Sequence, residues 1–166
     1  VAAFGLFTNV PYETPQADKR IWGRMAYFFN GVQALGEIRP VHTRVSWEGK
    51  QIEDDILDGL VCSTTSVGGF KATRAVGEFG ISMNDGLYEV VLIRDIKNLA
   101  DFSAVAAKLL RMDFSDENYF ITAQTNKLRF EFERPVAWTL DGEFGGSVMD
   151  VEICNHHRAI EMIVPR

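Results

Sequence analysis

The stretch VHTRVSWEGKQIEDDIL, residues 41–57, decides the fold class of this chain. Apolar or β-branched side chains occupy every second position from Val41 to Trp47, which is the pattern of a strand with one buried face. Glu48-Gly49 comes next, and a two-residue turn that ends in glycine commonly joins antiparallel strands. KQIEDDIL supplies the second strand. We therefore predict a β-hairpin over residues 41–57 within an antiparallel sheet.

Short β-rich runs continue along the rest of the chain, and most of them are bounded by Gly, Asn or Asp. No alternation of strands with crossover helices is visible, so a doubly wound parallel sheet is disfavoured. The runs are LVCST (60–64), LYEVVLI (87–93), NYFITAQ (118–124), KLRFEFE (127–133), VAWTL (136–140), VMDVEIC (148–154) and HRAIEMIV (157–164).

Two helices interrupt these strands. The first is predicted to begin at Thr14, which can cap free N–H groups ahead of Pro15, and to end near Gly36. The second is predicted to begin at Asn98, with Asp101 in its first turn and apolar residues at helical spacing after it. The prediction is therefore one domain over residues 1–166 with a mainly β (α+β) fold, an antiparallel β-sandwich with two helices.

The charge of the chain limits its partners. It carries 17 basic and 23 acidic residues, which gives a net charge of −6. A net negative charge repels phosphate backbones at long range, so we expect no nucleic-acid partner.

Cysteines and histidines do not form a metal-ligand spacing. Cys62 and Cys154 lie in apolar, strand-like runs, and we predict two buried free thiols in a protein of a reducing compartment. His42, His156 and His157 lack a zinc-binding helix motif or a cysteine partner. We predict solvated or hydrogen-bonded strand histidines, with metal binding as the alternative.

The apolar amino terminus, VAAFGLFTNV, has no preceding positive charge, and no run of about 20 apolar residues occurs. We expect neither a signal peptide nor a membrane span here. The chain begins without Met, and we expect it to be a piece of a longer protein.

Three turn-like segments carry the residues that could do chemistry. TTSVGGFK, residues 64–71, reads either as a turn between strands or as a glycine-rich anion contact. SMNDGLY, residues 82–88, reads either as a turn or as an oxygen cage for Mg²⁺ or Ca²⁺. Asp141-Gly142-Glu143 follows a strand and reads either as a surface turn or as a site with a general base. If Gly142 breaks the strand, the two carboxylates diverge; if the backbone stays extended, they share a face.

In their order along the chain, these segments resemble the soluble diacylglycerol kinase-like lipid kinases of bacteria. The resemblance covers nearly the whole chain. The matching residues are FGLFT (4–8), YETPQ (12–16), Lys19, Gly23, Ala26, Tyr27, SVGGF (66–70), NDGL (84–87), DGE (141–143) and IEMIVP (160–165).

This resemblance implies a two-lobed enzyme related to the NAD kinases, of which the chain is the carboxy-terminal, substrate-binding lobe. The family's other lobe carries a GGDGT nucleotide motif, and that string does not occur here. By resemblance, therefore, ATP is bound mainly by a lobe absent from this chain, and the isolated fragment is inactive.

The resemblance also implies roles for individual residues. Glu143 would be the general base that takes the proton of the lipid hydroxyl, with Asp141 as its helper. A structural Mg²⁺ would be held by the Asp85 carboxylate. The remaining implied positions are the backbone carbonyls of Ser82 and Leu87 at the cation, and Ser66, Gly68 and Gly69 facing the cleft between lobes, where ATP binds.

The implied substrate is diacylglycerol or a related lipid, phosphorylated at the inner membrane face from the cytoplasm. Exposed strand edges favour a homodimer as a further partner state. Two alternatives stay open: a non-catalytic lipid-binding β-sandwich, and a nicotinamide-nucleotide kinase of the same superfamily.

Overall fold

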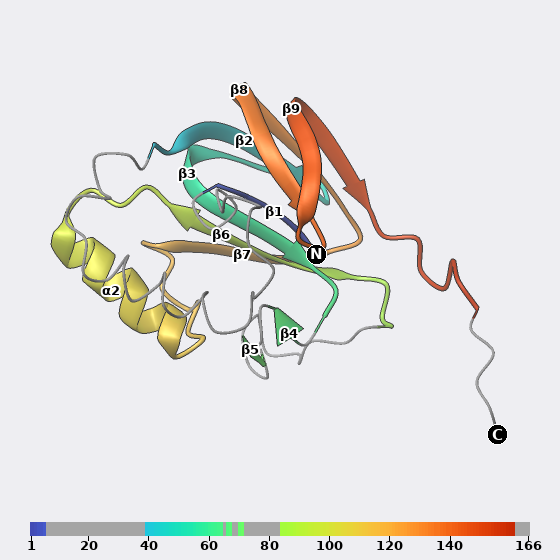
Figure 1. Cartoon of the computed structure of the whole chain (residues 1–166), viewed down its shortest axis with the longest axis horizontal. Coiled ribbons are helices and arrows are strands. Elements are labelled where there is room, and N and C mark those ends of the chain that lie inside the picture. The colour runs from blue at the N-terminus through green and yellow to red at the C-terminus, as the bar shows by residue number, and fades with distance from the viewer. Residues whose placement is uncertain (6–38, 65, 68–69, 72–83, 162–166) are drawn as a thin grey trace.

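The computed structural model describes residues 1–5, 39–64, 66–67, 70–71 and 84–161 (Figure 1). The predicted helix from Thr14 to Gly36 lies outside the described residues, and so do Gly68, Gly69 and Ser82.

The predicted hairpin is confirmed. Strand β2 (Val41–Trp47) pairs with β3 (Lys50–Cys62) in antiparallel register, from Val41 opposite Ile56 to Trp47 opposite Lys50. Glu48 and Gly49 have φ of 48° and 74°. Two successive positive φ values match the right-handed twist of the flanking strands, which is why a glycine is favoured in this turn.

A seven-stranded antiparallel sheet forms the body of the molecule (Figure 1). Across the sheet, β9 is followed by β8, then by β1 and β2 in the same position, then by β3, β6 and β7. The bounds of the other strands are β1 (Ala2–Gly5), β6 (Tyr88–Arg94), β7 (Phe120–Thr125), β8 (Lys127–Leu140) and β9 (Glu143–Cys154).

Strands β1 and β2 together fill one strand position between β3 and β8. On β3, β1 pairs with Asp58–Val61 and β2 pairs with Lys50–Ile56. Gly5 thus ends one segment of this row, and Val41 begins the next.

The sheet curls so that its concave face encloses an aromatic core. Phe4, Phe130 and Trp138 are at most 3% exposed, and their ring centroids lie 4.8–5.6 Å apart. Residues of β2, β6, β7 and β8 line one small apolar cavity, among them Val45, Leu92, Ile121 and Leu128, so these strands surround a common core. This barrel-like closure gives the predicted mainly β class, with two β layers around one core.

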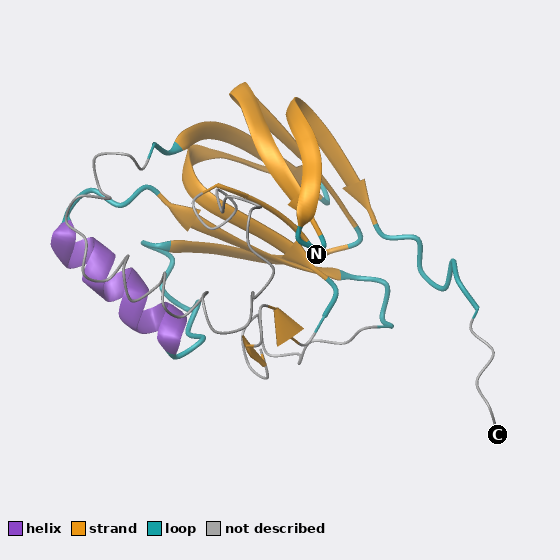
Figure 2. Cartoon of the chain, viewed as in Figure 1, coloured by secondary structure: helices purple, strands orange, loops and turns teal. Residues whose placement is uncertain are grey.

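Helix α2 (Leu99–Leu110) covers the opposite face of the sheet (Figure 2). Alternate residues of β6 divide between the two faces: Val90 and Leu92 join the aromatic core, and Val91 and Ile93 pack with the helix residue Val105. Burial on both faces explains the unbroken apolar run of β6.

The predicted cap of α2 is confirmed. The Asn98 side-chain oxygen accepts the backbone N–H of Asp101 at 3.0 Å, which satisfies one of the free donors of the first turn.

Three strand predictions need correction. KLRFEFE and VAWTL belong to one long strand, β8, because a register irregularity between Glu131 and Val136 accommodates Pro135. Residues 50–62 likewise form one strand with a register shift between Ile56 and Asp58. The predicted last strand is wrong over residues 157–161, which form turn and coil, and Ile160 is 83% exposed.

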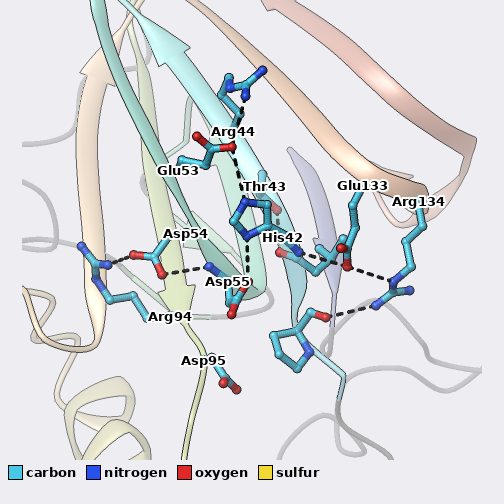
Figure 3. A network of polar contacts seen from close by, with 12 residues as sticks. His42, Thr43, Arg44, Glu53, Asp54, Asp55, Arg94, Asp95, Glu133 and Arg134 are labelled. Carbon is cyan, nitrogen blue, oxygen red and sulfur yellow. Dashed lines mark hydrogen bonds and ion pairs between the residues drawn. The ribbon is translucent and has the colours of Figure 1, made fainter.

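Both cysteines are free, as predicted, although Cys154 is only half-buried. His42 is a hydrogen-bonded strand histidine: its ring lies between Asp55 and Glu53 (Figure 3). His156 and His157 follow β9 and do not belong to a strand, which corrects that part of the prediction.

Candidate functional site

The Asp141-Gly142 pair forms the turn of the β8–β9 hairpin. The two residues have φ of 50° and 90°, and Leu140 pairs with Glu143 on either side of them. Of the two predicted alternatives, the backbone therefore breaks at Gly142. The two carboxylates of this segment belong to different elements, one to the turn and one to β9.

Asp141 ties this turn to the first residue of the chain. Its N–H donates to the Val1 carbonyl at 2.8 Å.

Glu143 is the first residue of β9, and its side chain is exposed. Within the described part of the chain, no hydrogen bond or ion pair occupies its carboxylate. A carboxylate at a strand end with free oxygens can approach a substrate hydroxyl, which is what a general base needs.

The pairing register brings the three predicted segments to one end of the sheet. Leu140 is opposite Ala2, Ala2 is opposite Val61, and Val61 is opposite Val90. The hairpin turn directly follows Leu140, and the chain continues from the end of β3 into β4. On the far side of this row, the Asn-Asp-Gly loop immediately precedes β6.

Three strand intervals separate Leu140 from Val90, which is roughly 14 Å at about 4.8 Å per interval. The acidic hairpin and the Asp85 loop therefore lie at the same end of the sheet, and the strands that carry them are separated there by this distance. Sequence spacing alone does not bring them together, because 55 residues lie between Asp85 and Asp141.

The Asn-Asp-Gly segment is a compact turn. The Asp85 Oδ1 atom accepts the Leu87 N–H at 3.0 Å, and Gly86 has φ of 83°. The segment following β9 lies against this turn: His157 Nε2 is 2.9 Å from the Asn84 carbonyl, and Asn155 Nδ2 donates to the Leu87 carbonyl at 3.4 Å.

The donor set of this turn suits a hard divalent cation. Mg²⁺ and Ca²⁺ prefer carboxylate and carbonyl oxygens, and the turn offers both at Asp85 and Leu87. The described residues contain no group of three or more His, Cys, Asp or Glu side chains that could hold a metal. A cation here would therefore depend on a single carboxylate and on backbone oxygens.

Glu89 is a residue that sequence reasoning missed. It is 1% exposed, and among the described residues neither carboxylate oxygen has a hydrogen-bond partner of normal geometry. Burial raises its pKa, and the nearby charge of Asp85 acts in the same direction. The signal was available, because a glutamate inside the apolar run LYEVVLI is unusual for a strand that is buried on both faces.

The Ser-Val-Gly-Gly-Phe segment is flanked by two short strands. Strand β4 (Ser66–Val67) pairs antiparallel with β5 (Phe70–Lys71) in a separate two-stranded sheet. The predicted turn between strands thus has its strands in place. The role of Ser66, Gly68 and Gly69 toward ATP stays a prediction.

The fold is that of diacylglycerol kinase-like enzymes. A crystal structure of a Bacillus anthracis str. Sterne protein assigned as a diacylglycerol kinase superposes with a TM-score of 0.65 at 15% identity, over 92% of this chain and 49% of that one. A second diacylglycerol kinase structure from the same strain gives a TM-score of 0.52 at 16% identity, over 81% of this chain and 45% of that one.

Sequence relatives carry the same name. The diacylglycerol kinase of Bacillus subtilis (strain 168) is 30% identical over 166 residues, which is 100% of this chain and 53% of that protein. That of Staphylococcus epidermidis RP62A is 25% identical over 166 residues, 100% of this chain and 51% of that protein. No family model matches the chain. The predicted resemblance is confirmed: relatives named diacylglycerol kinase match this chain over its whole length, and solved structures assigned as diacylglycerol kinases share its fold.

The chain spans about half the length of the curated relatives that it matches. Among the described residues, no helix is both long and apolar enough to cross a membrane.

Proposed function

We propose that the chain is the carboxy-terminal, substrate-binding lobe of an ATP-dependent lipid kinase. The full enzyme would phosphorylate the hydroxyl of diacylglycerol or a related lipid. Two facts support this: the sequence relatives are named diacylglycerol kinase, and the chain corresponds to about half of each. The other half would supply the ATP-binding lobe, so the isolated chain would be inactive.

The observation that carries the proposal is the row of paired residues from Leu140 to Val90. This row brings three features to one end of the sheet: the carboxylate of Glu143, the end of β3 from which the chain continues toward Gly68-Gly69, and the Asp85 turn. Phosphoryl transfer requires little covalent chemistry from the protein, because positioning and charge stabilisation supply most of the catalysis. A shared sheet end is a suitable platform for both tasks.

In this reaction, Glu143 acts as the general base. Its carboxylate accepts the proton of the lipid hydroxyl while the hydroxyl oxygen forms a bond to the γ-phosphorus of ATP. The bond from that phosphorus to the bridging oxygen breaks, and ADP leaves with the bonding electrons. Asp141 helps by fixing the hairpin through its backbone bond to Val1.

Cation binding would fall to the turn beside β6. The Asp85 carboxylate and the carbonyls of Ser82 and Leu87 would hold a structural Mg²⁺, which would fix the conformation of this turn. Ser66, Gly68 and Gly69 would face the cleft between the lobes, on the side of ATP.

The substrate implies a membrane surface. We place the enzyme in the cytoplasm, bound peripherally at the inner face of the membrane, where its lipid acceptor resides. The free edge of β9 could pair with a second copy, which would give a homodimer.

A panel of acceptors tests this function most broadly. The full-length enzyme is incubated with labelled ATP, Mg²⁺ and vesicles containing diacylglycerol or other hydroxyl lipids, and in parallel with a nicotinamide dinucleotide. The proposal predicts label transfer to a lipid. Transfer to the dinucleotide would identify a nicotinamide-nucleotide kinase, and lipid binding without transfer would identify a non-catalytic binding domain.

A further inference from the structure

A short segment after β9 contacts the Asp85 turn through two hydrogen bonds and one packing contact. We refer to residues 155–157 as the C-terminal clip. It reaches three of the four residues of the Asn-Asp-Gly-Leu sequence: Asn84 and Leu87 through their carbonyls, and Gly86 by packing.

His157 makes the shorter of the two hydrogen bonds between the clip and the Asp85 turn. Its Nε2 atom is 2.9 Å from the Asn84 carbonyl. A carbonyl can only accept, so Nε2 must carry the proton and donate. The imidazole is thereby fixed in one tautomer at this contact.

The ring of His157 also lies directly against Gly86. A Cβ atom on Gly86 would be 3.0 Å from both Cβ and Cγ of the histidine, which is tighter than normal packing. Gly86 thus meets two requirements, a positive φ and close approach of the ring. The turn and the clip fit each other closely at this point.

Asn155 anchors the clip to the body of the sheet. Its N–H donates to the Asn126 carbonyl at 2.7 Å, in the connection between β7 and β8. Its side-chain amide then donates to the Leu87 carbonyl. The clip is therefore hydrogen-bonded both to the sheet and to the Asp85 turn, and it fixes the turn relative to the sheet.

We propose that Asn155 and His157 are positioning residues for cation binding: Asn155 orients the Leu87 carbonyl, and His157 holds the backbone of Asn84 and Gly86 beside it. This inference rests on the proposed cation site, and it adds residues that lie seventy positions further along the chain. An amide donor on one lone pair of the Leu87 carbonyl leaves the second lone pair for a cation. The donor fixes the direction in which that second lone pair points.

Partners of this kind have measurable effects on affinity. Groups that hydrogen-bond to metal ligands typically change metal affinity by about 10- to 100-fold when they are removed. A merely structural role would instead lower stability without changing the affinity of the folded protein for the cation. The two roles are therefore separable.

The test titrates MgCl₂ into the full-length enzyme without nucleotide and follows hydrogen exchange of the Leu87 amide, which bonds to Asp85 Oδ1. His157→Phe keeps a ring over Gly86 but removes the donor, and His157→Gln restores a donor. His156→Phe is the matched control, because the His156 ring makes no hydrogen bond within the described residues.

The proposal predicts that Asn155→Leu raises the Mg²⁺ concentration at half-saturation at least about tenfold, because Asn155 bonds to a proposed cation ligand. His157→Phe should raise it in the same direction by a smaller factor, and His157→Gln should recover most of that loss. His156→Phe should bind as the parent does. A parent-like midpoint in both His157→Phe and Asn155→Leu overturns the proposal while leaving the cation site intact. No Mg²⁺ response in the parent enzyme overturns the cation site itself, and the proposal with it.

Discussion

The ring of Phe4 lies directly over Gly59, in the space that a Cβ atom on residue 59 would occupy. The two residues are register partners on β1 and β3, and Phe4 is fully buried. Across the other edge of β1, Phe4 pairs with Trp138, and the two ring centroids are 4.8 Å apart. The missing side chain at residue 59 is therefore what allows an aromatic core under the short strand β1.

Gly59→Ala should destabilise the fold by roughly 1–3 kcal/mol, because the added methyl group displaces a packed ring. Urea unfolding measures this cost. The control is the double variant Phe4→Leu/Gly59→Ala, in which the smaller side chain leaves room for the methyl group. Its cost should be less than the sum of the two single substitutions, and strict additivity would show that the ring and the glycine do not interact.

Gly142→Ala should destabilise the β8–β9 hairpin by about 1–2 kcal/mol, because a side chain at φ of 90° meets its own backbone. Gly142→Asn should cost less, since asparagine tolerates positive φ better. Ser147→Ala, at an exposed position of β9, serves as the control and should leave the midpoint of urea unfolding unchanged. A Gly142→Ala variant as stable as the parent would contradict the positive φ assigned to residue 142 in this turn.

His42 should make stability depend on pH. Its hydrogen bond to Asp55, and then that to Glu53, raise the pKa of the imidazole (Figure 3). A raised pKa in the folded state stabilises the protein fully below about pH 6.5, and this contribution is lost as pH rises through the folded value. The melting temperature of the parent protein should therefore fall, relative to that of His42→Gln, between mildly acidic and mildly alkaline pH.

His156→Gln is the control for that comparison, since the His156 ring makes no hydrogen bond within the described residues. The difference should shrink at high salt, because the His42 ring and both carboxylates are exposed. A melting difference that does not change with pH would exclude His42 as the titrating group.

Asp85→Ala should remove the effect of Mg²⁺ on thermal stability. Asp85 supplies the carboxylate of the proposed cation turn and also bonds to the Leu87 N–H, so a lower melting temperature in chelator is expected as well. Asp85→Asn retains an acceptor for that N–H and separates the two effects: the turn persists while the cation response disappears. A full Mg²⁺ response in Asp85→Asn would place any cation elsewhere.

Local signals in the sequence predicted local structure well. Alternation from Val41 to Trp47 with Glu48-Gly49 predicted one hairpin, and Asn98 predicted the start of α2, because turn and cap preferences depend on a few neighbouring residues. KLRFEFE and VAWTL were predicted as two runs, but they form one strand, because a register irregularity between Glu131 and Val136 lets β8 continue past Pro135. Such irregularities depend on partner strands.

The candidate site also combines features that local sequence predicts with features that depend on long-range pairing. Composition and order of motifs indicated Asp141, Glu143 and Asp85, but their common sheet end follows from β1 lying between β3 and β8. No periodicity in the sequence encodes that long-range pairing. The contacts of His157 with the Asp85 turn were equally invisible, since they join segments seventy residues apart.

Glu143→Gln in the full-length enzyme tests the central claim most directly. The substitution keeps the size of the side chain and removes its ability to accept the lipid proton. We predict that phosphate transfer from labelled ATP to diacylglycerol falls by about 10²- to 10⁴-fold, with an unchanged melting temperature. Glu133→Gln, an exposed glutamate of β8, should retain full activity. Turnover by Glu143→Gln within twofold of the parent enzyme would contradict the assignment of Glu143 as the base.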